Sequence, residues 1–189
     1  MTLEGAVYRN DWDDLQTPVL VDPATFLNAL INAGGARTVG LEMSAAWQPI
    51  NGLILRLSGS HMEAEYTEDV LNANIRDGDR VLGVPETTLS AAATYRWPLS
   101  SALNGFLHGD AQYTSDRVDI ASGQLPSDAL TSVDLRIGLE GESWGAYLVG
   151  DNLTDEEGAA DVIFQGFGGG ITTRLRPRTY GLTLRYSFN

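Results

Sequence analysis

The stretch that decides the fold is Thr179-Tyr180-Gly181-Leu182-Thr183-Leu184-Arg185-Tyr186-Ser187-Phe188, close to the end of the chain. Every second residue from Tyr180 to Phe188 is apolar or aromatic, and the residues between them are small or polar. A period of two places these sets on opposite faces of a strand, whereas a helix would mix them. The segment therefore predicts a β-strand with one apolar face and one polar face.

The same alternation recurs along most of the chain. It is clear within 133–139 and 38–48, and further strands are expected at 3–15, 53–66, 87–97, 103–114 and 144–152. Several of these segments approach the roughly 9 to 11 residues that a tilted strand needs to cross a bilayer. Strands of soluble proteins are usually nearer to about 5 or 6 residues. The sequence thus predicts an all-β protein with about eight long strands.

The connections between these strands differ in length. Short connections are expected at 49–52, 98–102 and 141–143, and long ones at 67–86, 115–129 and 153–177. Short turns at one end and long loops at the other are typical of antiparallel transmembrane β-barrels. We therefore expect a segment of such a barrel, with the short turns facing the periplasm and the long, acid-rich loops outside the cell.

Three tryptophans support this orientation. Trp47 and Trp97 each end a strand just before a short turn, and Trp144 begins a strand just after one. All three should stand at one level of the barrel, where aromatic side chains form a girdle at the membrane interface. We predict that Trp47, Trp97 and Trp144 form this girdle.

Composition excludes several other classes of protein. The 189 residues include 25 acidic and 12 basic side chains, a net charge of −13, which argues against binding to nucleic acid. The chain has no cysteine, so disulfides and thiolate metal sites are excluded, and no apolar run is long enough for a membrane helix. Residues 1–8 do not resemble a signal peptide, so we expect a mature, trimmed or incomplete chain.

Two segments near the end resemble a known family. Tyr147-Leu148-Val149-Gly150-Asp151-Asn152-Leu153-Thr154-Asp155-Glu156 is similar to the "v-x-N-L-T-D" strand of TonB-dependent receptors, and 176–188 resembles their terminal "P-R-x-y-G-l-x-l-x-y-x-F" strand. Upstream, 32–42 is similar to the family's "N-a-G-x-a-x-x-x-G-v-E" segment, and 8–16 resembles the strand before it. The resemblance covers nearly the whole chain.

This resemblance implies a 22-stranded outer-membrane barrel, closed by a plug, that takes up an iron chelate (siderophore), cobalamin or oligosaccharide with energy relayed by TonB. The sequence has room for about eight strands and shows no plug or TonB box. We therefore expect residues 1–189 to be the C-terminal part of the barrel, from a truncated gene or a partial sequence. The expected location is the outer membrane of a Gram-negative bacterium. Expected partners are its lipid, an unknown small-molecule ligand and, in the complete receptor only, TonB.

The resemblance also implies a role for the last strand. In the family, an aromatic residue at or near its end helps the barrel assembly machinery to recognise the chain. Phe188 fits this role, although Asn189 follows it, and the residues on the same face complete the predicted assembly signal: Tyr180, Leu182, Leu184 and Tyr186. A simpler interpretation places Phe188 in the lipid-facing girdle, and both interpretations are compatible.

Candidate chemistry is sparse. His61 and His108 lie on different predicted strands without a paired motif, and no serine nucleophile elbow or flanking pair of carboxylates stands out. We therefore expect no catalytic residues, no cofactor, no metal site and no enzymatic activity.

Alternation alone leaves other functions open, because charged residues such as Glu42, Arg56 and Asp110 suit a wet lumen and a solvated surface equally well. One alternative is a complete eight-stranded outer-membrane barrel with a structural or adhesive role, in which 3–15 would pair with 179–188. Another is a soluble β-sandwich or lipocalin-like binder, which would be soluble without detergent. An outer-membrane enzyme is the least favoured alternative.

Overall fold

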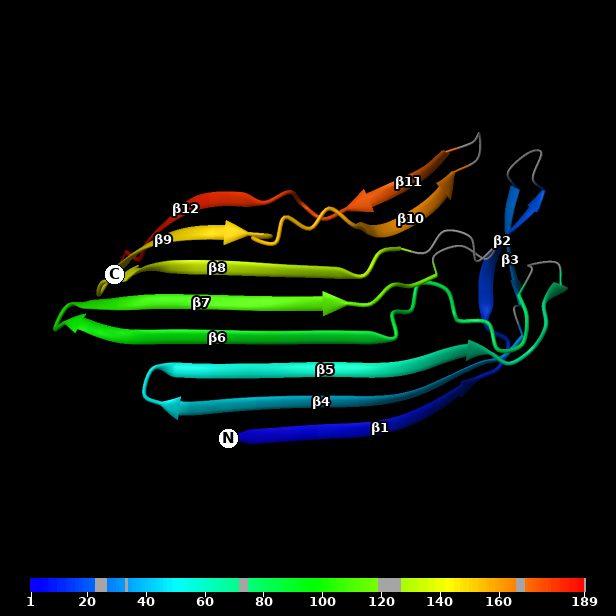
Figure 1. Cartoon of the computed structure of the whole chain (residues 1–189), viewed down its shortest axis with the longest axis horizontal. Coiled ribbons are helices and arrows are strands. Elements are labelled where there is room, and N and C mark those ends of the chain that lie inside the picture. The colour runs from blue at the N-terminus through cyan, green and yellow to red at the C-terminus, as the bar shows by residue number, and fades with distance from the viewer. Residues whose placement is uncertain (23–26, 33, 72–74, 119–126, 166–168, 189) are drawn as a thin grey trace.

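Eight antiparallel strands form one broad sheet in the computed structural model, which describes residues 1–22, 27–32, 34–71, 75–118, 127–165 and 169–188. Their order in the sheet is β1-β4-β5-β6-β7-β8-β9-β12 (Figure 1). The strands are β1 (Thr2–Trp12), β4 (Ala36–Ile50), β5 (Leu53–Tyr66), β6 (Thr87–Ser100), β7 (Leu103–Thr114), β8 (Leu130–Glu140), β9 (Trp144–Asp151) and β12 (Thr179–Tyr186).

Most sequence predictions of strands are confirmed. β5 and β7 have the predicted bounds, while β4 and β6 extend beyond theirs. The segment predicted as 3–15 ends at Trp12 because Asp14, with a φ of 55°, turns the chain out of the extended conformation. The last strand ends at Tyr186, two residues before the predicted end.

Two hairpins were missed. β2 (Gln16–Asp22) pairs with β3 (Leu27–Asn32), and β10 (Ala159–Gln165) pairs with β11 (Gly169–Arg174). The first contains the continuous apolar run Pro18-Val19-Leu20-Val21, which has no period of two. Both hairpins lie at the long-loop end of the sheet (Figure 1).

Short turns close the opposite end of the sheet, as predicted. At Asn51-Gly52, Gly52 has a φ of 83°, and a Cβ there would overlap the carbonyl oxygen of Arg96 on the neighbouring strand. The same approach lets the amide of Arg96 donate to the carbonyl oxygen of Gly52 at 2.9 Å. Glycine is therefore required by both the backbone conformation and the close contact.

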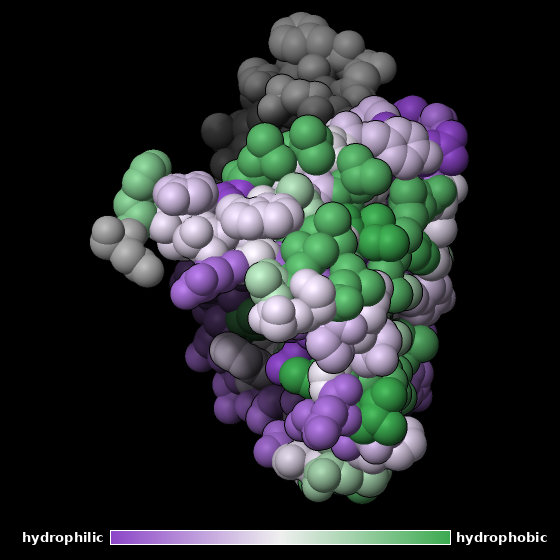
Figure 2. Space-filling view, turned by 90° about the vertical axis from the view of Figure 1, so that its left-hand side faces the viewer, coloured by the Kyte–Doolittle hydropathy of each residue, from purple (hydrophilic) through white to green (hydrophobic). Residues whose placement is uncertain are grey.

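Strand register sorts the side chains onto two chemically different faces. One row of neighbours across five strands consists of Ala45, Leu57, Ala91, Ala111 and Val133. The adjacent row, on the other face, consists of Ser44, Ser58, Ser90, Gln112 and Ser132. Figure 2 views the short-turn end, where hydrophobic side chains gather in a nearly continuous band. One face of the sheet is therefore apolar and the other polar.

The apolar face is uncovered. Many of its large side chains remain at least 40% exposed, including Leu41, Met43, Leu57, Leu135, Leu148 and Leu182. One cluster of buried apolar residues lies at the long-loop end, where Leu15, Val70 and Val81 pack around Tyr66 and Ile75. A soluble β-sandwich would bury its apolar face in a core, so this arrangement disfavours that alternative.

β1 and β12 are the edge strands of the sheet. Within the described residues β1 pairs with β4 and β12 pairs with β9, so the pairing between 3–15 and 179–188 that a closed eight-stranded barrel requires does not occur. Among these residues there is also no helix with the length and hydropathy needed to span a membrane.

Candidate functional site on the polar face and the long loops

The polar face contains an open hollow of about 560 Å³. Residues lining it include Glu4, Glu42, Ser58, Ser60, Ser90 and Gln112. Small hydroxyl side chains leave this space, and they can donate hydrogen bonds to a solute or to water as well as accept them. The hollow is therefore suited to holding water or a polar solute.

An aromatic and ionic cluster stands on the same face near the short turns. Arg96 Nε lies 2.9 Å from Glu140 Oε2, and the hydroxyl of Tyr147 donates to Glu140 Oε1 at 3.0 Å. The guanidinium of Arg96 also lies 4.6 Å from the ring centre of Phe106, whose ring meets Tyr147 edge-on at 5.3 Å. These contacts leave Phe106 only 6% exposed and Tyr147 7%. Because the four residues come from β6, β7, β8 and β9, their contacts hold these strands together. Sequence analysis missed this cluster, although both aromatic residues occupy positions of the polar face.

The two histidines lie apart on opposite faces. His61 Nδ1 contacts Thr87 Oγ1 at 2.9 Å, and its register partner Leu41 belongs to the apolar face. His108 Nδ1 contacts Thr94 Oγ1 at 2.8 Å, and its Nε2 lies 3.5 Å from Asp110. The described residues contain no group of three His, Asp or Glu side chains placed to hold a metal ion.

Asn152 organises the turn after β9. It is 6% exposed and has a φ of 50°, a conformation that asparagine tolerates better than most residues. Its Nδ2 donates to the carbonyl oxygens of Glu156 at 3.0 Å and Arg176 at 2.9 Å. Its Oδ1 accepts from the Thr154 hydroxyl at 3.0 Å and from the Glu156 amide at 2.9 Å. All four side-chain hydrogen bonds therefore hold one turn and the chain segment that leads into β12.

Asp155 makes a second link between the turn after β9 and the segment that leads into β12. Arg178 Nη2 lies 2.9 Å from Asp155 Oδ2, and the amide of Arg178 donates to Asp155 Oδ1 at 3.3 Å. Asn152 and Asp155 belong to the "N-L-T-D" motif, whereas Arg176 and Arg178 flank Pro177 at the start of the terminal motif. The structure thus joins the "N-L-T-D" motif to the start of the terminal motif.

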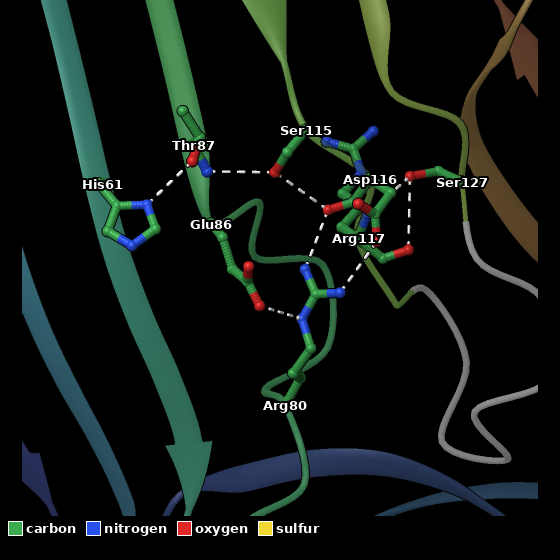
Figure 3. A network of polar contacts seen from close by, with 8 residues as sticks. All are labelled: His61, Arg80, Glu86, Thr87, Ser115, Asp116, Arg117 and Ser127. Atoms are coloured by element: carbon green, nitrogen blue, oxygen red, sulfur yellow. Dashed lines mark hydrogen bonds and ion pairs between the residues drawn. The ribbon is translucent and has the colours of Figure 1, made fainter.

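Arg80 lies at the centre of a polar network among the long loops (Figure 3). Its Nε lies 3.0 Å from Glu86 Oε1, its Nη1 lies 2.9 Å from Asp116 Oδ2, and its Nη2 donates to the carbonyl oxygen of Asp116 at 3.0 Å. Nearby, the Ser115 hydroxyl accepts from the Thr87 amide at 3.1 Å. The network connects the β5–β6 loop with the β7–β8 loop. No motif in the sequence predicted it.

A comparison with protein-family models matches residues 1–153 to the TonB dependent receptor-like beta-barrel family. The chain belongs to this family. Its sheet also superposes on solved barrels. The ferric yersiniabactin uptake receptor FyuA from Yersinia pestis gives a TM-score of 0.83 at 20% identity, over 99% of this chain and 27% of that one.

Two further structures are similar. The ferric preacinetobactin receptor BauA from Acinetobacter baumannii gives a TM-score of 0.69 at 21% identity, over 98% of this chain and 27% of that one. The ferric-catecholate import receptor Fiu from Escherichia coli K12 gives 0.71 at 19% identity, over 98% and 25%. At these identities the likeness shows the fold. The chain spans about a quarter of the length of each solved receptor.

The TonB-dependent receptor fold explains the two faces of the sheet, because a transmembrane barrel turns its apolar face toward lipid and its polar face toward the lumen. The three tryptophans of the predicted girdle all lie near the short turns. Trp47 and Trp144 are exposed, whereas Trp97 is half-buried because its indole stacks on Tyr95 at 5.1 Å and lies over Gly105. Their place at a membrane interface stays a prediction.

The predicted assembly signal occupies one face of the edge strand β12. Tyr180, Leu182, Leu184 and Tyr186 are all exposed, and Phe188 is 90% exposed just beyond the strand, with its ring 4.8 Å from that of Tyr186. The amide of Ser187 donates to the carbonyl oxygen of Ser143 at 2.8 Å, which holds the chain beside the β8–β9 turn. Phe188 is therefore accessible, and its role in assembly stays a prediction.

Proposed function

We propose that this chain forms the C-terminal part of the barrel wall of an outer-membrane receptor that takes up a ferric siderophore. The observation that carries the proposal is the register of the sheet, which puts apolar rows on one face and polar rows on the other across strands of 8 to 15 residues. In this arrangement lipid covers the apolar face and the polar face lines the lumen.

The long loops would lie outside the cell and the short turns in the periplasm. In such receptors the remaining strands of the barrel would continue the sheet from β1 and β12, whose exposed backbone groups need partners in lipid. The plug and the contact with TonB would belong to other parts of the complete receptor. The likeness to parts of much larger barrels favours this arrangement over a complete eight-stranded barrel with a structural or adhesive role.

The choice of siderophore over cobalamin or oligosaccharide rests on the similar structures, which are receptors for ferric yersiniabactin, ferric preacinetobactin and ferric catecholates. To test it, cells with the complete receptor would be compared with cells lacking it for accumulation of radioactive iron presented as different siderophores. We expect accumulation of at least one ferric siderophore to depend on the receptor. Receptor-dependent uptake of only cobalamin or an oligosaccharide would contradict the proposal.

We also propose that the exposed end of β12 is the assembly signal and that the chain is handled by the barrel assembly machinery. Replacing Phe188 with alanine should lower the amount of receptor in the outer-membrane fraction several-fold, because the terminal aromatic side chain would no longer be available for recognition. Immunoblots of membrane fractions measure this effect. Ser187→Ala is the control, since it retains the backbone contact with Ser143, and equal losses in both variants would contradict a specific role for Phe188.

A further inference from the structure

The long connections of the sheet contact one another in a continuous series. The amide of Thr67, in the β5–β6 loop, donates to the carbonyl oxygen of Gly35 at 2.9 Å, and Leu15 packs against the buried pair Tyr66 and Ile75. These contacts join the connection that follows β1 to the β5–β6 loop. The described part of the β5–β6 loop therefore packs on a small apolar core that it shares with β5 and with Leu15.

The series continues from the β5–β6 loop to the β7–β8 loop through Arg80 and Gly83. Arg80 binds the side chain and the carbonyl oxygen of Asp116, and the amide of Gly83 donates to the carbonyl oxygen of Val118 at 2.7 Å. Beyond this point, Asp128 links the β7–β8 loop to the next connection. The amide of Ala159 donates to Asp128 Oδ2 at 2.8 Å, and the amide of Asp128 donates back to the carbonyl oxygen of Ala159 at 3.1 Å.

The acidic charge of the long connections makes the ion pairs of Arg80 the most important contacts in this series. The connections 13–35, 67–86, 115–129 and 153–177 together contain fifteen acidic residues and five basic ones. Glu86 and Asp116 both lie within 3.0 Å of the guanidinium of Arg80, whose side chain is 30% exposed. Without this cation, the two carboxylates would face each other unpaired in an already acidic region. Removing it should therefore drive the two loops apart as well as break two ion pairs.

We propose that Arg80 is a latch that couples the β5–β6 loop to the β7–β8 loop, so that residues 75–86 of the first and residues 115–118 and 127–129 of the second keep or lose their contacts together. The latch can be released, because the guanidinium is partly exposed and an anion that competes for it would leave Glu86 and Asp116 to repel each other. A contact made at one loop is thereby transmitted to the other. This coupling does not rest on the proposed uptake function, since it requires only the contacts within the chain.

Hydrogen exchange of the complete barrel that contains this chain, in detergent micelles, tests the latch. In Arg80→Gln, the amides of Gly83 and Ser127 should exchange at least about fivefold faster, while those of β5, β6 and β7 keep their protection. Ser127 is informative because it lies in the other loop, where its amide donates to the carbonyl oxygen of Arg117 at 2.9 Å. Arg76→Gln, which removes an arginine of the same loop that makes no ion pair among the described residues, should leave Ser127 unchanged.

Asp116→Asn should speed the exchange of the same amides less than Arg80→Gln, because it breaks one ion pair and leaves no two carboxylates unpaired, and the double variant should not exceed Arg80→Gln. Unchanged exchange at Ser127 in Arg80→Gln, or additive effects of the two substitutions, would overturn the proposal. A salt titration of the unmodified barrel gives an independent test that does not depend on folding of a variant. Raising the ionic strength should speed exchange at Gly83 and Ser127 together, and equal protection at low and high salt would also overturn it.

Discussion

Replacing Leu135 with arginine is expected to destabilise the folded barrel wall in a lipid bilayer by about 2 to 4 kcal/mol. Leu135 lies in the middle of β8, points away from the polar face and is 40% exposed in the chain. Its register partners on both sides are Gly109 and Gly150, so no neighbouring side chain would shield the new charge. Denaturant unfolding of the complete receptor in phospholipid vesicles measures the change.

The size of this effect separates lipid from water as the surroundings of the apolar face. If the face were in water, an exposed leucine could become arginine at a cost of no more than roughly 0.5 kcal/mol. The matched control is Ser132→Arg on the same strand, which places the charge on the polar face beside Gln112. We expect the control to cost less than about 1 kcal/mol in the same vesicles. A larger loss for Ser132→Arg than for Leu135→Arg would reverse the assignment of the two faces.

The sheet was predictable because its signals are local. A period of two marks each strand and assigns its faces, and the ends of β5 and β7 coincide with turn residues such as Asn51-Gly52. The length of the connections then fixed which end of the sheet carries short turns. None of these inferences required knowledge of which residues meet across the sheet.

The parts that were missed depend on contacts between distant residues. Phe106 and Tyr147 are 41 positions apart, and each by itself is an aromatic residue at a position expected to be polar. Their mutual packing explains the exception. Arg80 and Asp116 likewise meet only because β6 and β7 bring two loops together, with a separation of 36 residues along the chain. Charge composition shows that these loops are acidic but not where a cation would join them.

Replacing Asn152 with alanine is expected to destabilise the receptor by about 3 kcal/mol. The change removes four hydrogen bonds and leaves the carbonyl oxygen of Arg176 without its side-chain donor. Alanine would also have to adopt a φ of 50° without the side-chain hydrogen bonds that stabilise this conformation for asparagine. Because Arg176 leads into β12, the amides of Thr183 and Arg185, which by the alternation of an antiparallel pair face β9, should also lose protection from hydrogen exchange.

Asn152→Gly separates the two contributions. Glycine adopts a positive φ at little cost, so this variant should be about 1 kcal/mol more stable than Asn152→Ala while lacking the same four hydrogen bonds. Unfolding of both variants in the same vesicles measures the difference, and hydrogen exchange locates it. The free energy of unfolding of both variants could fall by less than about 1 kcal/mol while the amides of β12 keep their protection from exchange. That result would mean that the turn does not align the last strand with β9. The junction of the two motifs would then need another physical explanation, with the ion pair between Asp155 and Arg178 as the next contact to remove.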